Sequence, residues 1–318
     1  MDSRSDDDGR QGVLHGLLGL LYRHYHRLPH RAVNRVALPL VRTTRPRWLI
    51  RHFIRMWISA GAIPIAEFEQ QDYGSIEDFF LRRVRPGARP LDCGFVAPAD
   101  GQLVGAGRVA AGTMLVVKGR PTDLDSLLGQ RPPLVQLSSS GHGQPDAVTP
   151  QPPPMDSTAF KGGCWATIYL SPHSYHWVHM PLDGEVLDAR WIPGRFFPQN
   201  ALARRHIAGI YEQNERVVLR CRSDRGSPFV LVLVGASIVG GIELTLCRRA
   251  DRARDETTPI GLRLAKGDPL GYFTFGSTVV ALVCPGWALA LPTEAGSGTL
   301  LMGHTLFVRE EDDQTHDA

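Results

Sequence analysis

Short apolar runs rich in β-branched residues recur through most of this chain, and turns containing Gly and Pro separate them. The runs lie at 113–117, 165–170, 217–220, 229–234, 242–246, 279–283 and 288–290. Their shortness and close spacing favour antiparallel strands over alternating βαβ units. We therefore expect an α+β protein that is mainly β, with an antiparallel β-sandwich or barrel at its core. The hydrophobic content of 43% is ordinary for a protein that buries such a core.

The segment before these runs is one-sidedly basic. No Asp or Glu occurs between Asp8 and Glu67. The same stretch carries Arg10, Arg23, Arg27, Arg31, Arg35, Arg42, Arg45, Arg47, Arg51 and Arg55. Such a block predicts a polyanionic partner, either nucleic acid or anionic lipid. Nucleic acid fits less well, because the chain shows no helix-turn-helix or similar recognition motif.

Residues 11–66 have the apolar spacing of amphipathic helices. Val13, Leu14, Leu17, Leu18 and Leu21 form one apolar group, and apolar residues between Trp48 and Ile58 form a second that is interleaved with arginines. A helix of this kind lies in the headgroup plane of a membrane, or it packs on the protein's own core with a solvated arginine face. The pattern leaves both interpretations open. We treat 1–66 as an N-terminal helical, membrane-associating region and 67–318 as a second domain that contains the β-rich runs.

The remaining composition favours a reducing compartment. The five cysteines are odd in number, widely spread and never in a C-x-x-C pair, which argues against a disulfide framework or a zinc site. No apolar run reaches the ~18 residues that span a bilayer, and the acid-rich start is unlike a signal peptide. We expect a peripheral membrane protein on the cytoplasmic face of the cell membrane. Residues 138–155 are polar and proline-rich, which predicts a mobile surface loop.

Three segments carry residues whose side chains could take part in a reaction. They are Pro98-Ala99-Asp100-Gly101, then Tyr175 to Pro181 with its two histidines, and Gly271 to Thr278 with its Gly-Ser-Thr. Singly, each has a plain structural explanation as a turn, a pair of satisfied histidines or the start of a strand. Together they provide an acid, a base and a hydroxyl nucleophile, the set that a Ser-His-Asp relay uses in any chain order.

These segments resemble the signature blocks of the phosphatidylserine decarboxylase family, and the similarity covers roughly residues 65–307 in the family's order. Further matching blocks are Ser75 to Phe80 with the following arginines, Lys118-Gly119, Ala166 to Pro172, Ile192-Pro193-Gly194, Asn214-Glu215-Arg216, Val234 to Gly240 and Lys266-Gly267. The chain departs from the family in having Phe275 before Gly-Ser-Thr where Leu is common. It also has Trp177 after the first histidine, where Arg is common. The second change removes a charge near the site and bears on headgroup affinity.

The resemblance implies a self-cleaving enzyme that converts phosphatidylserine to phosphatidylethanolamine and carbon dioxide. Asp100 would orient His179, His179 would deprotonate Ser277, and Ser277 would attack the carbonyl of Gly276. We expect glycine at 276 to tolerate a strained backbone and to leave its carbonyl open to attack. Cleavage between Gly276 and Ser277 would leave chains 1–276 and 277–318 as a heterodimer. Ser277 would become the covalent pyruvoyl cofactor that forms a Schiff base with the substrate amine, and His176 would reprotonate the product.

Three other interpretations stay open at this stage. The first is a metal-dependent hydrolase built on His173, His176 and His179 with Asp100, although we expect no metal. The second is a lipoyl- or biotinyl-type carrier, which conflicts with the absence of lysine after Lys266. The third is an inactive, lipid-binding family member. The oligomeric state is left open by the sequence, a homo-oligomer included.

Overall fold

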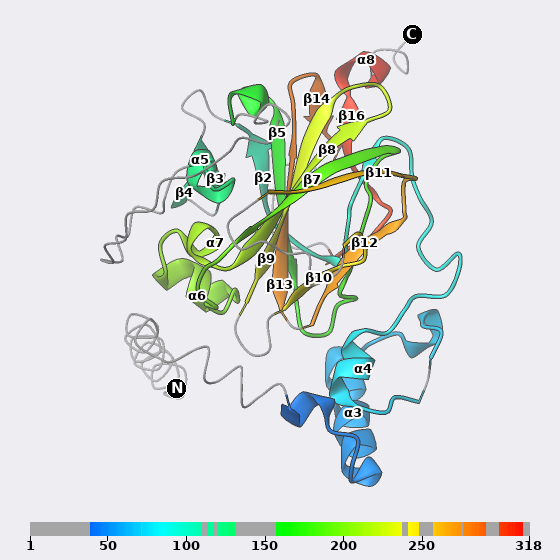
Figure 1. Ribbon diagram of the computed structural model, residues 1–318. Coiled ribbons are helices and arrows are strands. Elements are labelled where there is room, and N and C mark those ends of the chain that lie inside the picture. Colours follow the sequence, from blue (N-terminus) through cyan, green and yellow to red (C-terminus); the bar gives the residue numbers. More distant parts are fainter. Residues whose placement is uncertain are drawn as a thin grey trace, which may run out of the picture.

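Antiparallel strands dominate the computed structural model of the chain (Figure 1). It describes residues 39–70, 72–109, 114–117, 120–130, 157–236, 241–247, 257–274, 276–290 and 299–313. The largest sheet has eight strands in the order β11-β7-β8-β9-β13-β5-β2-β15. Their bounds are Thr257–Leu264, Gly184–Ile192, Arg216–Ser223, Pro228–Gly235, Ser277–Val283, Cys164–Leu170, Gly101–Arg108 and Thr299–Leu300. Strand β13 lies inside the sheet, paired on one side with β9 and on the other with β5.

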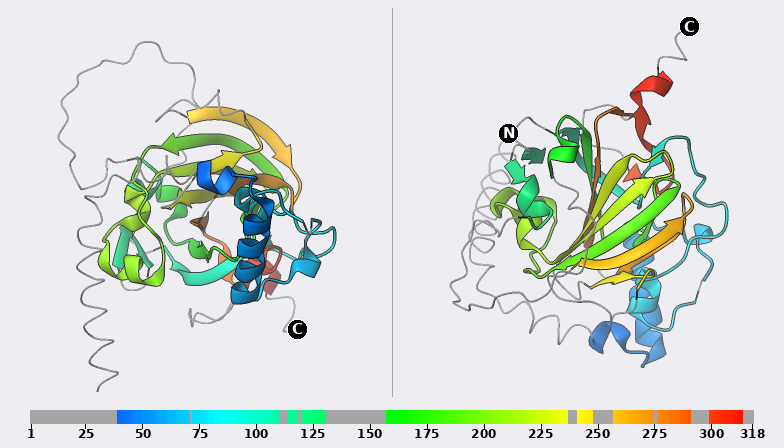
Figure 2. Two further views of the ribbon diagram at one scale, coloured as in Figure 1. Left: turned by 90° about the horizontal axis from the view of Figure 1, so that it is seen from below. Right: turned by 45° about the horizontal axis from the view of Figure 1, so that its top comes forward.

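Two small sheets and a hairpin accompany the large sheet. One has the order β10-β12-β6, with bounds Ile242–Leu244, Pro269–Phe273 and Trp177–His179. The other has the order β1-β16-β14, with bounds Phe95–Val96, Thr305–Arg309 and Trp287–Leu289. The hairpin joins β3 and β4, Met114–Val117 and Arg120–Asp123. In Figure 2 the large sheet is strongly curved.

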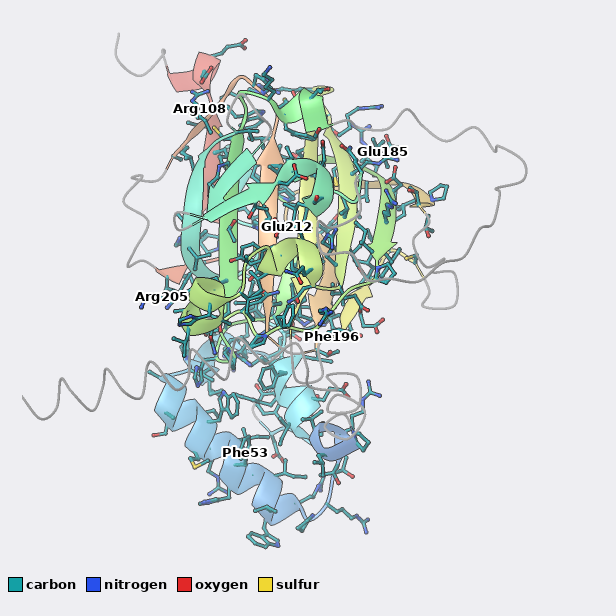
Figure 3. The ribbon with its side chains drawn as sticks, turned by 90° about the vertical axis from the view of Figure 1, so that its left-hand side faces the viewer. Phe53, Arg108, Glu185, Phe196, Arg205 and Glu212 are labelled. Atoms are coloured by element: carbon teal, nitrogen blue, oxygen red, sulfur yellow. The ribbon has the colours of Figure 1, made fainter. Side chains whose placement is uncertain are left out.

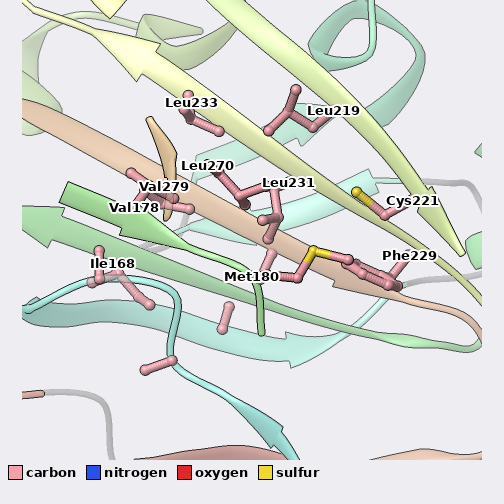
Figure 4. Packing of buried hydrophobic residues seen from close by; sticks show 14 of the residues in the cluster. Ile168, Val178, Met180, Leu219, Cys221, Phe229, Leu231, Leu233, Leu270 and Val279 are labelled. Atoms are coloured by element: carbon pink, nitrogen blue, oxygen red, sulfur yellow. The ribbon is translucent and has the colours of Figure 1, made fainter. Parts of the chain in front are cut away.

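The period of two along each strand divides the buried residues of the large sheet between two cores. In β13, Val279, Ala281 and Val283 face one cluster, and Val280 and Leu282 face another. The first cluster packs the large sheet against both small sheets, as a sandwich does; Figure 4 shows side chains from both layers meeting there. The second cluster lies under short helices on the other face. These are α5, η3, α6 and α7, with bounds Leu124–Leu127, Ser157–Phe160, Ala201–His206 and Ile210–Gln213.

A third cluster joins the N-terminal helices to the site region. Helix α3 (Arg47–Gly61), η2 (Ile65–Glu67) and α4 (Ile76–Phe80) contribute apolar residues that pack with Tyr175 and Trp177. These helices lie at the lower end of the molecule in Figure 1, and Phe53 of α3 is labelled there in Figure 3. Only Ile50 and Ile54 of α3 are buried. A last short helix, α8 (Glu310–Asp313), follows β16.

The predicted fold class is confirmed, since the protein is mainly β with antiparallel sheets packed as a sandwich, and the large sheet remains open. The expected amphipathic helix containing Trp48 is α3. The first predicted helical group, before residue 39, lies outside the described residues, as do the loop at 138–155 and Phe275. The division at 66/67 stays a prediction, and the third cluster contains residues from both sides of it.

Candidate active site

The candidate nucleophile is the first residue of the central strand β13. Ser277 pairs with Leu170 of β5 and Gly235 of β9. Its side chain is fully buried, and its Oγ has no hydrogen-bond partner among the described residues. Because alternate residues of a strand share a face, Ser277 lies on the same side as Val279, toward the first core. Buried hydroxyls are usually paired. Among the described residues the hydroxyls of Thr167, Thr278 and Tyr211 lack a partner as well, so Ser277 is set apart by its position directly after Gly276.

Backbone hydrogen bonds bring the three predicted segments together. The His179 amide donates to the Pro98 carbonyl at 2.8 Å, which links the second segment to the first. The Phe273 amide donates to the His176 carbonyl at 3.0 Å, which links the third segment to the second. The segments are far apart in the sequence, and strand pairing assembles them at one end of the first core.

His176 lies just before β6 and is completely buried. Neither ring nitrogen meets a partner at hydrogen-bonding geometry, although the backbone of Ser174 lies beside the ring. The ring of Phe80 from α4 covers it, with centroids 5.1 Å apart. Burial, and then the charge of Arg82, lower the pKa of His176 to about 3. In the intact chain His176 is therefore neutral at physiological pH.

His179 is held by two hydrogen bonds. Its Nδ1 lies 2.7 Å from the carbonyl oxygen of Gly267, and its Nε2 lies 2.9 Å from the hydroxyl of Tyr175. Burial lowers the pKa of His179, and the hydrogen bond to Gly267 and the charge of Asp100 act in the opposite direction. Both ring nitrogens are thus engaged, which fixes the orientation of the imidazole.

Asp100 is held by a different pair of donors. Arg89 donates from Nη2 to Oδ2 at 2.7 Å and from Nε to Oδ1 at 3.1 Å, and the Met302 amide donates to Oδ1 at 2.8 Å. Gly101 lets this segment approach β5, since a Cβ there would lie 2.5 Å from the Tyr169 carbonyl oxygen. We expected Asp100 to orient His179; among the described residues no hydrogen bond joins the two side chains. Asp100 acts on the ring of His179 through space.

The comparisons with known proteins agree with this geometry. The model of the phosphatidylserine decarboxylase family matches residues 76–308. The chain belongs to the phosphatidylserine decarboxylase family. It is 34% identical over 295 residues to the phosphatidylserine decarboxylase proenzyme of Bordetella petrii, covering 87% of this chain and 93% of the relative. The proenzyme of the same name from Brevibacillus brevis is 31% identical over 296 residues, covering 90% and 96%.

Membership of the phosphatidylserine decarboxylase family makes the chain a decarboxylase, a carboxy-lyase. The metal-hydrolase interpretation finds no support in the described residues, where no group of three His, Cys, Asp or Glu could hold a metal ion. The three histidines have different neighbours: His173 lies 5.5 Å from the Trp57 ring, whereas His176 packs on Phe80 and His179 bonds Tyr175. No described helix is long and apolar enough to cross a membrane.

Two departures from the common phosphatidylserine decarboxylase pattern have different outcomes. Phe275 is outside the described residues. Trp177, where Arg is common, is buried and donates its indole N–H to the Leu81 carbonyl at 3.0 Å. The guanidinium of Arg83 lies over the Trp177 ring, 4.2 Å from its centroid. A cation is therefore present beside position 177, supplied by another residue.

Sequence reasoning missed three residues that hold the site. Arg89 bridges the buried Asp100 and Glu67, to which its Nη1 donates at 2.8 Å. Tyr175 bonds His179. Arg82 is buried and donates to the backbone carbonyls of the 173–174 segment, which leads into His176. Tyr175 belongs to the histidine segment and Arg82 to the arginines that follow Phe80, so both stood in motifs without a role assigned to them, whereas Arg89 lies outside every motif.

Proposed function

We propose that this protein converts phosphatidylserine to phosphatidylethanolamine and carbon dioxide, using a pyruvoyl group that it makes from Ser277 by autocatalytic cleavage. The observation that carries the proposal is the Ser277 hydroxyl, which is fully buried, unpaired among the described residues and next to a glycine peptide bond. A hydroxyl consumed by the reaction needs no permanent hydrogen-bond partner. The names of the relatives, which describe them as proenzymes, agree with a chain that processes itself.

The first step moves one proton and exchanges one bond. His179, once the Tyr175 hydroxyl has released its Nε2, takes the proton of the Ser277 hydroxyl, and the oxygen attacks the carbonyl carbon of Gly276. The peptide bond to the Ser277 nitrogen breaks, and an ester replaces it. Asp100, whose charge raises the pKa of His179, stabilises the imidazolium that forms. The imidazolium returns its proton to the Ser277 nitrogen. A base then removes the Cα proton of Ser277 as its Cβ–O bond breaks, which frees the carboxylate of Gly276. Water replaces the nitrogen of the imine that remains, which releases ammonia and leaves the ketone.

Gly276 has room around its α-carbon. Among the described residues, a Cβ built there would meet only the Cβ of Ala236, at 3.9 Å. This room agrees with a carbonyl that is open to attack, and the tolerance of backbone strain at Gly276 stays a prediction. The residues around Ser277 fit a pyruvoyl group, which keeps the three carbons of the serine and loses the unpaired hydroxyl. When present, this group supplies a ketone that binds the substrate amine and accepts electrons as carbon dioxide leaves.

His176 is our candidate for returning a proton to the substrate carbon. In the intact chain the ring is neutral and covered by Phe80, so it is not in the protonated, imidazolium form that acts as an acid. The assignment therefore requires that cleavage exposes the ring to water or substrate. Strand pairing gives a route for this coupling, because the carbonyl of His176 accepts from Phe273, shortly before the bond that breaks.

The two chains made by cleavage would remain one heterodimer. Strand β13 would begin the small chain, and all seven of its residues pair with both β5 and β9 of the large chain. Strand β16 of the small chain pairs with β1 of the large chain. This shared sheet would hold the chains together without a covalent link.

We place the enzyme on the cytoplasmic face of the cell membrane, held by α3 against anionic lipid. The outward side of α3 exposes Trp48, Leu49 and Met56, at 71%, 49% and 54%, beside the exposed Arg47 and Arg55. Apolar and basic side chains on one exposed helix are typical of an interfacial anchor. The buried side of the same helix packs on the third cluster. Packing on the protein's own core therefore accounts for one side of α3, and binding to a membrane surface accounts for the other.

Trapping with borohydride tests the chemistry. Wild-type protein reduced in the presence of phosphatidylserine should gain the mass of the lipid amine on the fragment beginning at residue 277, and should form phosphatidylethanolamine without reduction. Ser277→Ala should show neither. Conversion without any mass gain on that fragment would contradict the pyruvoyl proposal, and a cleaved chain that converts nothing would indicate an inactive family member.

A further inference from the structure

Arg83 is the one arginine of the 82–89 segment whose side chain has no hydrogen-bond or ion-pair partner among the described residues. Arg82 and Arg85 donate to backbone carbonyls, and Arg89 is paired with two carboxylates. Arg83 is also exposed. An exposed and unpaired guanidinium is open to an anion from outside the chain.

Packing on Trp177 holds the Arg83 guanidinium in place. Its central carbon lies 4.2 Å from the centroid of the Trp177 ring. That ring is buried, and it is fixed by the hydrogen bond of its N–H to the Leu81 carbonyl and by Tyr272, whose ring centroid lies 4.8 Å away. A guanidinium that lies over a ring keeps N–H groups at its edge, and these match the oxygens of a phosphate in a bidentate contact.

The Arg83 guanidinium lies close to the base of the proposed self-cleavage. Trp177 and His179 are alternate residues of β6, so their side chains share one face of that strand. Burial lowers the pKa of His179, and the charge of Arg83 acts in the same direction, so this charge is within electrostatic range of the ring. A cation there hinders the uptake of a proton by His179. Arg83 therefore does not assist self-cleavage, and its charge suits an anion that binds after it.

The order of groups in the lipid favours phosphate as that anion. The phosphate lies between the acyl chains, which stay in the membrane, and the serine amine, which reacts. The ring on which Arg83 lies belongs both to the cluster that holds α3 and to the strand that carries His179. The serine carboxylate is a poorer partner for a fixed cation. Its charge leaves with carbon dioxide, so a cation bound to it would stabilise the substrate more than the transition state.

We propose that Arg83 binds the phosphodiester of the phosphatidylserine headgroup, with its guanidinium held on the face of Trp177. This inference rests on the proposed function. The exposed Glu69, whose amide donates to the Arg83 carbonyl at 2.9 Å, forms no ion pair with the guanidinium. The phosphate would supply the anionic partner that Arg83 does not find among the described residues.

Arg83→Gln tests this in the cleaved enzyme. Its self-cleavage should be as complete as that of wild type, which also shows that the variant folds. In mixed micelles of a neutral detergent, its KM for phosphatidylserine should rise about 10-fold with kcat little changed, because the lost contact holds the headgroup before and during the reaction. Arg225→Gln removes an exposed arginine from the turn between β8 and β9 and should leave KM unchanged. A wild-type KM in Arg83→Gln would overturn the inference.

Phosphatidylethanolamine separates the two anions of the headgroup, because it keeps the phosphate and lacks the carboxylate. As a competitive inhibitor it should bind about 10-fold more weakly to Arg83→Gln than to wild type. Equal inhibition of the two proteins would reject phosphate as the ligand of Arg83.

A neutral phosphate tests the same contact without any substitution in the chain. In the wild-type enzyme the methyl phosphotriester of phosphatidylserine should have a KM about 10-fold higher than phosphatidylserine itself. Equal KM values for the two lipids would contradict the inference. A wild-type chain that forms no phosphatidylethanolamine would reject the proposed function, whereas normal turnover with these constants unchanged would reject only the role of Arg83.

Discussion

At the scale of single residues, burial sets the charges in this site. Burial keeps the His176 ring in its neutral form. The buried carboxylate of Asp100 pairs with the guanidinium of Arg89, whose side chain is 4% exposed. The reacting groups are thus held in a fixed arrangement by partners that take no part in the bond changes. Two predictions about stability follow from these two residues.

The buried His176 should make the intact chain less stable in acid. Its pKa is about 3 when folded and about 6.5 when unfolded, so the unfolded chain binds the extra proton between these values. Stability is fully present above about pH 6.5 and falls as the pH drops toward 3. In the Ser277→Ala protein, the loss from this group between pH 6.5 and 4.5 should be about 2–3 kcal/mol, measured by urea unfolding. His176→Leu should remove that part of the slope, and the partly exposed His206→Leu should not; identical slopes in all three would contradict the burial of His176.

Arg89→Met should destabilise the fold more than an ordinary ion-pair deletion. It leaves the carboxylate of Asp100 buried without its counter-charge, at a cost of about 3 kcal/mol. Arg42→Met is the matched control, because its pair with Glu77 is on the surface and should contribute less than about 1 kcal/mol. Urea unfolding of both variants in the Ser277→Ala background measures the difference. A loss for Arg89→Met no larger than for the control would show that Asp100 is solvated.

At the scale of elements, the buried and the exposed side of helix α3 have different roles. Its buried side supports the cover over His176 through Trp57, whose ring lies 5.6 Å from that of Phe80. Its end can approach the site because residue 61 is glycine, where a Cβ would lie 2.2 Å from the His173 ring. Its exposed side carries Trp48 and three arginines, of which Arg51 pairs with Asp72 at 2.6 Å.

The exposed side of α3 predicts binding to anionic vesicles. Arg47→Gln with Arg55→Gln should weaken binding to phosphatidylserine–phosphatidylcholine vesicles by about 10–30-fold, since each basic residue near the surface contributes about 1 kcal/mol. Sedimentation with the vesicles measures this. The double change Arg222→Gln with Arg225→Gln removes the same charge from exposed positions around the β8–β9 turn and should have little effect. Equal losses for the two pairs would show a general charge effect and remove α3 from the account.

Elements with strong local signals were the predictable part of this fold. The continuous apolar run at 279–283 belongs to β13, which is buried on both faces. Strand β11 was missed because it is largely exposed and its Pro259 and Gly261 interrupt the pattern. In the site, the motif residues were predicted, but the partner of each was not. Whether Asp100 bonds His179 or Arg89 depends on how distant segments pack, and no local pattern contains that.

At the scale of the whole molecule, the proposed cleavage site lies at the junction between two sheets. The bond between Gly276 and Ser277 joins the small sheet that holds the histidines to the central strand of the large sheet. Cutting it would free the end that carries the new cofactor while seven paired residues on each side keep the strand in place. Gel filtration of cleaved protein without denaturant should therefore give a single species that contains both chains, and separation of the chains would contradict this view of the sheet.

The mass of the purified protein under denaturing conditions tests the central claim most directly. Wild type should give two chains divided between residues 276 and 277, with the shorter one lighter by one ammonia than hydrolysis would leave it. Ser277→Ala should give one full-length chain. A wild-type protein that converts phosphatidylserine as a single intact chain, or a short chain with an ordinary N-terminal serine, would contradict the account.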